Sequence, residues 1–266
     1  MEETLHFLEL LNGRVAYRKL GNGPKCLVAF HGFARDGATF VPALTSQNAA
    51  HFTCYLIDLP FHGQTKWDDP YFTPSDLSYI IRRLIGKRQF EGAGHSLGGR
   101  LWLAMLQELD PLPDRLHLIA PDGIESLWGE WVEHAPSGLR KKLSGWLKRP
   151  ARFLRLASLL REWGVIDQFT LRYLQVQLAT ETTRKRLFST WQSLLYFKLG
   201  KHRAQHLLAG VDFPVEVYLG HRDTIVPASR ITEALEGLEN VHLHKLDCGH
   251  WDIVQHWQHK LKAPSI

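Results

Sequence analysis

The segment Gly94-His95-Ser96-Leu97-Gly98 sets one serine between two glycines, each two positions away. A serine held at a sharp turn between a strand and a helix needs small residues at these positions, because larger side chains would clash there. Residues 89–93 are short enough for the strand before such a turn. After the turn, apolar residues recur at helical spacing: Leu101, Trp102, Met105, Leu106 and Leu109. The pattern predicts that Ser96 is a nucleophile.

Two later segments offer the base and the orienting acid that a nucleophilic serine needs. Asp223 follows the apolar run 215–219, and His250 follows the run 241–246. Both are therefore expected just past the ends of strands, at the edge of an open parallel sheet where sites form. Asp122 also follows a predicted strand and is the alternative acid. Cys248 lies beside the predicted base, but no pair of glycines frames it, which argues against a thiol nucleophile.

A third segment offers donors for the negative charge that develops on a substrate oxygen. Residues 26–30 predict a buried strand that runs into His31-Gly32-Phe33. We expect the backbone N–H groups of Phe33 and Leu97 to form an oxyanion hole. His31 and His95 are expected to lie around the substrate and to shape the two turns without carrying protons.

These motifs, taken in order, resemble those of the α/β-hydrolase superfamily. A fourth, Asp58-Leu59-Pro60-Phe61-His62-Gly63-Gln64-Thr65, resembles a turn of that superfamily, with Phe61 in place of a glycine and Thr65 in place of a serine. The order of Ser96, Asp223 and His250 also agrees. The resemblance implies an α/β fold, a mostly parallel doubly wound sheet with an inserted helical cap. Residues 1–124 and 211–266 would form the core, and residues 125–210 the cap.

The alternation of apolar runs and helical stretches supports this fold. Asn12-Gly13 predicts a hairpin turn between residues 5–11 and 14–19. Strands expected after it alternate with helices, which favours a parallel sheet covered on both faces. Their ranges are 26–30, 51–58, 89–93, 115–120, 215–219 and 241–246. Glu91 falls in a central strand where apolar residues are expected. It requires either a buried cationic partner or a place near the strand end.

Composition bounds the class of protein. The 266 residues suit one enzyme-sized domain with an insertion. No apolar run approaches the roughly 20 residues of a membrane span, and the N-terminal residues lack a secretory pattern. Three cysteines suit reduced thiols and a cytoplasmic location. There is no metal-binding Cys/His spacing and no phosphate-binding loop, so we expect no metal and no cofactor.

The predicted cap carries an unusual charge. Residues 125–210 hold 15 Lys and Arg against six Asp and Glu, whereas the whole chain has a net charge of +5. Trp128 and Trp131 are expected to line an acyl-binding pocket. The basic surface is either a solvated outer face or a site for an acidic partner, since such a field steers association. Candidate partners are an acyl-carrier protein, a coenzyme A thioester and an anionic membrane surface. Nucleic acid is disfavoured because no recognition motif accompanies the charge.

The function expected from these residues is hydrolysis of a carboxylic ester or thioester through an acyl-enzyme on Ser96. The resemblance also implies two alternatives that use the same residues, a carbon–carbon bond hydrolase and a lyase of the menaquinone-synthesis type. Haloalkane dehalogenation is disfavoured because it uses aspartate at position 96. An alternative of another class is a noncatalytic ligand-binding or scaffold protein, since fold does not fix function.

Overall fold

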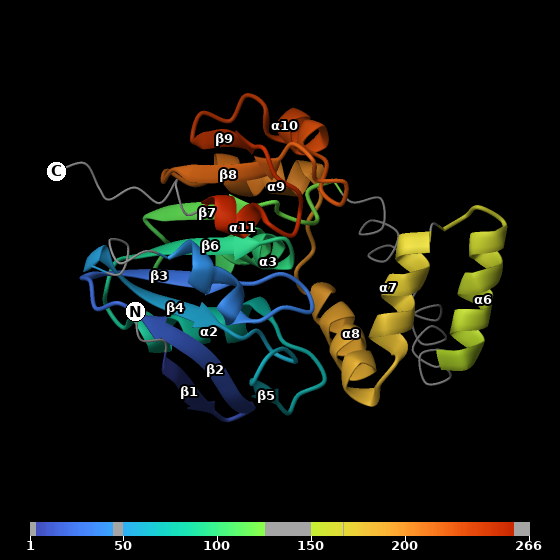
Figure 1. Cartoon of the computed structure of the whole chain (residues 1–266). Coiled ribbons are helices and arrows are strands. Elements are labelled where there is room, and N and C mark those ends of the chain that lie inside the picture. Colours follow the sequence, from blue (N-terminus) through green and yellow to red (C-terminus); the bar gives the residue numbers. More distant parts are fainter. Residues whose placement is uncertain (1–3, 45–49, 126–149, 167, 258–266) are drawn as a thin grey trace.

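The computed structural model describes residues 4–44, 50–125, 150–166 and 168–257 (Figure 1). Its strands are β1 (Thr4–Leu10), β2 (Gly13–Leu20), β3 (Lys25–Phe30), β4 (Phe52–Ile57), β5 (Lys66–Trp67), β6 (Phe90–His95), β7 (Arg115–Ile119), β8 (Val215–Gly220) and β9 (Val241–Leu246). They form one sheet in the order β1-β2-β4-β3-β6-β7-β8-β9, and β5 pairs with β2. Neighbours from β4 to β9 are parallel, whereas β2 pairs with β1, β4 and β5 in antiparallel fashion. The predicted α/β fold and its hairpin are confirmed.

Helices cover both faces of this sheet (Figure 1). One layer contains α2 (Pro74–Ile85), α3 (Leu97–Met105), α9 (Lys201–Ala209) and α10 (Ala228–Leu235), with the short η2 (Leu106–Glu108) after α3. The other layer contains η1 (Gly37–Ala43) and α11 (Ile253–Trp257). The two layers bury the central strands on both faces: β3 is buried from Cys26 onward, and β4 is buried from Phe52 onward. Parallel strands buried on both faces require such continuous apolar runs.

Three further helices lie at one edge of the sheet: α6 (Pro150–Glu162), α7 (Gln168–Leu178) and α8 (Glu181–Leu194) (Figure 1). Leu178 and Leu187 form the centre of a small second core there, to which the Phe33 side chain contributes. The predicted insertion of residues 125–210 also includes α9, yet α9 packs against α3. Leu207 and Leu208 of α9 belong to the main core. Of the helices in the predicted insertion, α6 and α7 stand apart from the main core, whereas α8 also reaches it through Leu194.

Glu91 finds its partner on the neighbouring strand. Its carboxylate lies 2.9 Å from Nε2 of His117 on β7, and His117 Nδ1 lies 3.3 Å from the Tyr218 hydroxyl on β8. All three side chains are buried. A chain of hydrogen bonds across adjacent strands thus satisfies the polar groups that the sheet interior encloses.

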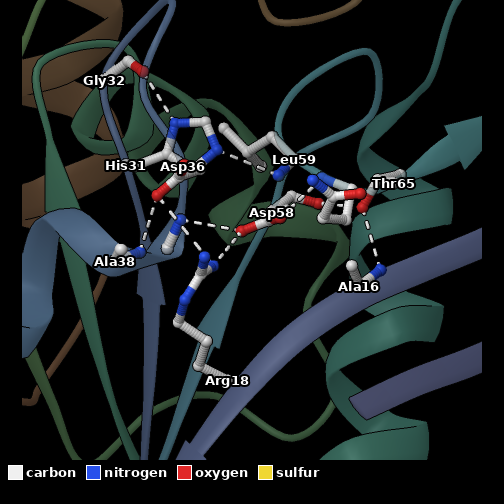
Figure 2. Close-up of polar contacts among 11 residues, drawn as sticks. Ala16, Arg18, His31, Gly32, Asp36, Ala38, Asp58, Leu59 and Thr65 are labelled. Carbon is white, nitrogen blue, oxygen red and sulfur yellow. Dashed lines mark hydrogen bonds and ion pairs between the residues drawn. The ribbon is translucent and has the colours of Figure 1, made fainter. Parts of the chain in front are cut away.

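Buried Asp58, just after β4, ties together the loops that approach the site (Figure 2). Its Oδ1 accepts bonds from Gly37 N–H (2.8 Å) and from Arg18 Nη1 (2.9 Å). Its Oδ2 accepts a bond from Gln64 N–H (2.8 Å). Such charge-assisted bonds are stronger than neutral ones. One carboxylate therefore joins β2, the start of η1 and the turn after β4.

The turn after β4 contains a residue with a left-handed backbone conformation that is not a glycine. Phe61, where the resembling motif has glycine, has φ of 69°. A non-glycine residue in this region costs about 1–2 kcal/mol. The bond from His62 N–H to Leu59 O (2.9 Å) closes the turn. The Phe61 ring packs against the Phe72 ring, with the two ring centres 6.2 Å apart. Packing of the Phe61 ring offsets part of the strain.

Replacing Asp58 by Asn should lower the free energy of unfolding by about 2–4 kcal/mol, because the amide cannot accept all three bonds and the buried negative charge that faces Arg18 is removed. Chemical denaturation measures the loss. The control is Asp36→Asn. Asp36 lies 3.9 Å from Arg18 but is only partly buried, and it caps η1 through Ala38 N–H, which Asn does equally well. A loss of similar size for both variants would contradict a central role for Asp58.

Candidate active site

The backbone at Ser96 is a tight turn between β6 and α3. Ser96 has φ of 50° and ψ of −112°, a conformation that costs about 1–3 kcal/mol. A Cβ at Gly98 would lie 2.0 Å from the Phe30 carbonyl oxygen, and one at Gly94 would lie 2.5 Å from the Gly98 carbonyl. Neither distance is tolerable for real atoms. The two glycines therefore permit α3 to start against the end of β3 and hold the serine in place.

Ser96, His250 and Asp223 form one line of hydrogen bonds. Ser96 Oγ lies 3.1 Å from Nε2 of His250, and Nδ1 of His250 lies 2.7 Å from Oδ2 of Asp223. The second oxygen of Asp223 accepts bonds from the N–H groups of Ile225 and Val226, both at 2.8 Å. His250 and Asp223 are buried. The carboxylate is thus fixed on one oxygen and directs the imidazole with the other.

The alternative acid, Asp122, occupies another position. Its backbone N–H donates to the Ser96 carbonyl oxygen at 3.1 Å, so the segment after β7 supports the turn at Ser96. The structure brings Asp223, and not Asp122, to Nδ1 of His250. Asp122 lines a cavity of about 220 Å³ that lies between residues 121–125 and residues 224–231.

The two predicted oxyanion donors lie at the ends of neighbouring strands. Leu97 is the first residue of α3, a position whose N–H has no acceptor within its own helix. Phe33 lies in the turn that Arg35 N–H closes on Gly32 O at 3.2 Å. A Cβ at Gly32 would lie 3.5 Å from that of Ser96, which shows how closely this turn approaches the serine. Within the described residues, neither N–H has a hydrogen-bond acceptor.

Three buried histidines surround these turns. His31 donates from Nδ1 to Gly32 O (2.7 Å) and accepts from Leu59 N–H at Nε2 (3.0 Å). His95 contacts the His250 carbonyl through Nε2 (3.1 Å), and His62 contacts Pro60 O through Nδ1 (2.9 Å). Burial lowers the pKa of His31 to about 4 and those of His62 and His95 to about 3. All three rings are neutral near pH 7. The predicted contact of His31 and His95 with substrate stays a prediction.

The remaining candidates divide by position. Trp128 and Trp131 lie outside the described residues, so their place in a pocket stays a prediction. Burial raises the pKa of the Cys248 thiol to about 11, which leaves it a poor nucleophile at neutral pH. Within the parts of the chain that the structure describes, no group of three or more His, Cys, Asp or Glu could hold a metal ion. No described helix is long and apolar enough to cross a membrane.

The sequence patterns do not predict two residues that lie near the site, Arg186 and Tyr173. The guanidinium of Arg186 on α8 lies 5.7 Å from the centre of the Phe33 ring, and the Tyr173 ring on α7 lies 6.3 Å from the same ring. Arg186 is one of many cations in its segment, and its spacing gives no signal. A helix that folds over Phe33 is what distinguishes it.

The three buried histidines predict a steep loss of stability in acid. Each has a lower pKa in the folded state than the ordinary value of 6.5, so the unfolded chain binds more protons as pH falls. The contribution of these neutral rings to the free energy of unfolding is complete above about pH 6.5. It declines as the pH falls to the folded-state pKa values, about 4 for His31 and about 3 for His62 and His95. Each contributes about 1.4 kcal/mol per pH unit to the slope. Denaturant titrations between pH 7 and pH 5 measure this slope.

His62→Gln should lower the slope of the free energy of unfolding against pH by the contribution of one histidine, whatever its effect on stability at pH 7. The control His206→Gln replaces an exposed histidine and leaves the three buried rings in place, so their share of the slope should remain. An unchanged slope in His62→Gln would show that His62 is not held neutral by burial.

Relatives of the chain include hydrolases of different substrates. Over 81 residues it is 37% identical to the pimeloyl-[acyl-carrier protein] methyl ester esterase of Xanthomonas oryzae pv. oryzae (strain MAFF 311018), a match that covers 30% of each protein. Over 270 residues it is 22% identical to a 2-hydroxy-6-oxononadienedioate/2-hydroxy-6-oxononatrienedioate hydrolase of Pseudomonas sp, with 96% of this chain and 91% of that one covered. The chain thus matches less than a third of the length of the first of these relatives.

The fold is shared with solved structures and with one family. An esterase from Thermogutta terrifontis superposes with a TM-score of 0.66 at 14% identity, covering 98% of this chain and 95% of that one. This likeness shows the fold alone. The model of the α/β hydrolase fold family matches residues 25–256, which is most of the chain. The chain therefore belongs to the α/β hydrolase fold family.

Proposed function

We propose that the protein is a serine hydrolase that cleaves a carboxylic ester or thioester through an acyl-enzyme intermediate. The observation that carries the proposal is the line from Ser96 Oγ through His250 to Asp223, at 3.1 Å and 2.7 Å. These distances lie within hydrogen-bond reach, as the relay of a proton between nucleophile and base requires. The esterase named among the relatives supports the same reaction class.

The first half of the reaction transfers the acyl group to the enzyme. His250 Nε2 accepts the proton of Ser96 Oγ while the oxygen attacks the substrate carbonyl carbon. The carbonyl oxygen becomes an oxyanion, which the N–H groups of Phe33 and Leu97 stabilise. One such donor typically contributes about 10²–10³ in rate. His250 then gives its proton to the leaving alcohol or thiol as the bond to the acyl carbon breaks.

The second half releases the acid. A water molecule gives its proton to His250 and attacks the acyl carbon of the ester on Ser96. Collapse of the second oxyanion breaks the bond to Ser96 Oγ, which recovers its proton from His250. Throughout, Asp223 holds the imidazole in one orientation and stabilises its charged form. Its two backbone bonds keep the carboxylate itself in place.

A carbon–carbon bond hydrolase is the second candidate, because the Pseudomonas relative, matched over most of both chains, carries the name of a dienedioate hydrolase. A vinylogous diketone substrate and an ester substrate separate the two functions directly. A lyase would release no water-derived acid, and a noncatalytic protein would turn over neither substrate.

An acidic partner is a further proposal, supported by the acyl-carrier protein in the name of the Xanthomonas relative. Arg152, Arg155 and Arg161 of α6 are exposed and lie on the helix farthest from the sheet (Figure 1). Four further basic residues of the predicted insertion, Lys141, Lys142, Lys148 and Arg149, lie outside the described residues. Such a surface would increase the rate of encounter with an anionic carrier.

Ser96→Ala and His250→Ala should each lower kcat/KM by at least about 10³-fold on any ester that the wild type cleaves, because the groups act as a unit. For the same reason the double variant should lose little more than either single one. A panel of acyl esters and thioesters of graded chain length supplies the substrates. A Ser96→Ala enzyme that retained most of its activity would refute the proposed nucleophile.

The basic surface should reveal itself by its salt dependence. The double variant Arg152→Glu/Arg155→Glu should lower kcat/KM on a carrier-bound ester about tenfold at low salt, and salt should weaken the wild type similarly, because exposed charges are screened beyond about 8–10 Å. A small neutral ester serves as the control and should react equally with both enzymes. Equal losses on both substrates would mean that the variant disturbs folding, and no loss on either would leave the surface as a solvated face.

A further inference from the structure

Arg186 is a half-buried cation at the contact between α8 and the turn that holds Phe33. One Nη2 hydrogen donates to Gln177 Oε1 on α7 at 3.0 Å, and the guanidinium lies over the Phe33 ring at 5.7 Å. Its Nε is buried without an acceptor. Among the described residues, no carboxylate lies within ion-pair distance of Arg186.

This arrangement is costly for the protein on its own. Burial lowers the pKa of Arg186, yet an arginine remains charged under all ordinary conditions. A partly buried charge without a counter-charge destabilises the fold, whereas an apolar residue of the same length would pack on Phe33 at no such cost. The Phe33 contact alone therefore does not account for a cation at this position. A negatively charged group on a bound ligand would account for the cation.

The surroundings of Arg186 offer further donors on the side of the active site. The Tyr173 ring packs against Phe33, and burial raises the pKa of its hydroxyl to about 12, so the hydroxyl keeps its proton. The Arg186 guanidinium and the Tyr173 ring lie 5.7 and 6.3 Å from the centre of the Phe33 ring, so both flank the same side chain. On α8, Thr190 lies one turn after Arg186, and its buried hydroxyl also has no partner within the described residues.

We propose that Arg186, together with the Tyr173 hydroxyl, binds a carboxylate that the substrate carries in addition to its scissile ester or thioester. This inference rests on the proposed function and specifies its substrate class. Phe33 would connect catalysis with carboxylate binding, because its N–H is a proposed oxyanion donor and its ring contacts Arg186. A planar guanidinium matches a carboxylate in geometry, and one arginine balances its single charge.

The carboxylate can belong to either end of the substrate. It lies on the acyl side in a monoester of a dicarboxylic acid, and on the leaving-group side in an ester of a hydroxy acid. Two substrate series separate these sources. The first comprises monomethyl esters of linear dicarboxylic acids from four to eight carbons, and the second comprises acetyl esters of hydroxy acids of similar length. The neutral methyl ester of each compound is its matched control.

The wild type should cleave the carboxylate-bearing member of one series with kcat/KM about tenfold or more above its neutral control. Arg186→Gln and Arg186→Met should remove that preference, because they lower kcat/KM for the charged ester much more than for the neutral one. Arg186→Lys should retain part of it, and Tyr173→Phe should weaken it. Lys185→Gln removes the same charge from an exposed position of α8 and should leave the preference intact.

Binding is measured without turnover in a Ser96→Ala background. Monomethyl adipate should raise Tm in that protein and fail to do so in Ser96→Ala/Arg186→Gln, while dimethyl adipate should act alike on both. If the wild type cleaves no ester but this Arg186-dependent shift in Tm is present, the carboxylate site stands and the ester hydrolase function falls.

Two results would overturn the inference and leave the proposed function intact. One is cleavage of neutral and charged esters at equal rates, with equal shifts in Tm in both backgrounds. The other is a loss of activity in Arg186→Gln and Arg186→Met that is the same for charged and neutral esters, which would assign Arg186 to the packing of α8 on Phe33.

Discussion

The close approach of α3 to the end of β3 is the constraint on which the site depends. Gly98 meets the Phe30 carbonyl so closely that a Cβ would lie 2.0 Å away, and Ser96 accordingly has φ of 50°. The other described non-glycine residues with positive φ are Ala34, Phe61 and Ala120. Each of the four follows the end of one strand, β3, β4, β6 or β7. Backbone strain is therefore concentrated at the edge of the sheet where the reacting groups meet.

Strain of this kind persists only where neighbouring contacts over-determine the backbone. Asp58 fixes the end of β4 to the start of η1 and to β2, and His31 bridges the turns after β3 and β4. The Phe33 side chain then joins this rigid edge to the helices beyond it. In this arrangement the core fixes the positions of Ser96 and of the turn that holds Phe33, and α7 and α8 pack against that turn through the Phe33 side chain.

The sequence predicts the local parts of this design and the three residues Ser96, Asp223 and His250, but it misses other contacts between distant segments. Glycines around Ser96, the Asn12-Gly13 turn and the buried runs each act within a few residues, so the elbow, the hairpin and the places of the strands along the chain could be predicted. The partner of Glu91 could not, because His117 reaches it only through the pairing of β6 with β7. Residues 201–209 fall within the predicted insertion of residues 125–210, yet they form α9, which packs on α3. Arg186 is indistinguishable in sequence from its neighbours and acquires its setting only when α8 folds over Phe33.

The central claim is that Ser96 is activated by its position and by His250. Labelling with a fluorophosphonate, followed by mass spectrometry of the peptides, tests it most directly, since this reagent reacts with activated serines and hardly at all with ordinary ones. The structure predicts one adduct, on Ser96, which forms rapidly in the wild type, is absent in Ser96→Ala and forms far more slowly in His250→Ala. A wild-type protein that stays unlabelled, or that carries its adduct on another residue, would contradict the claim.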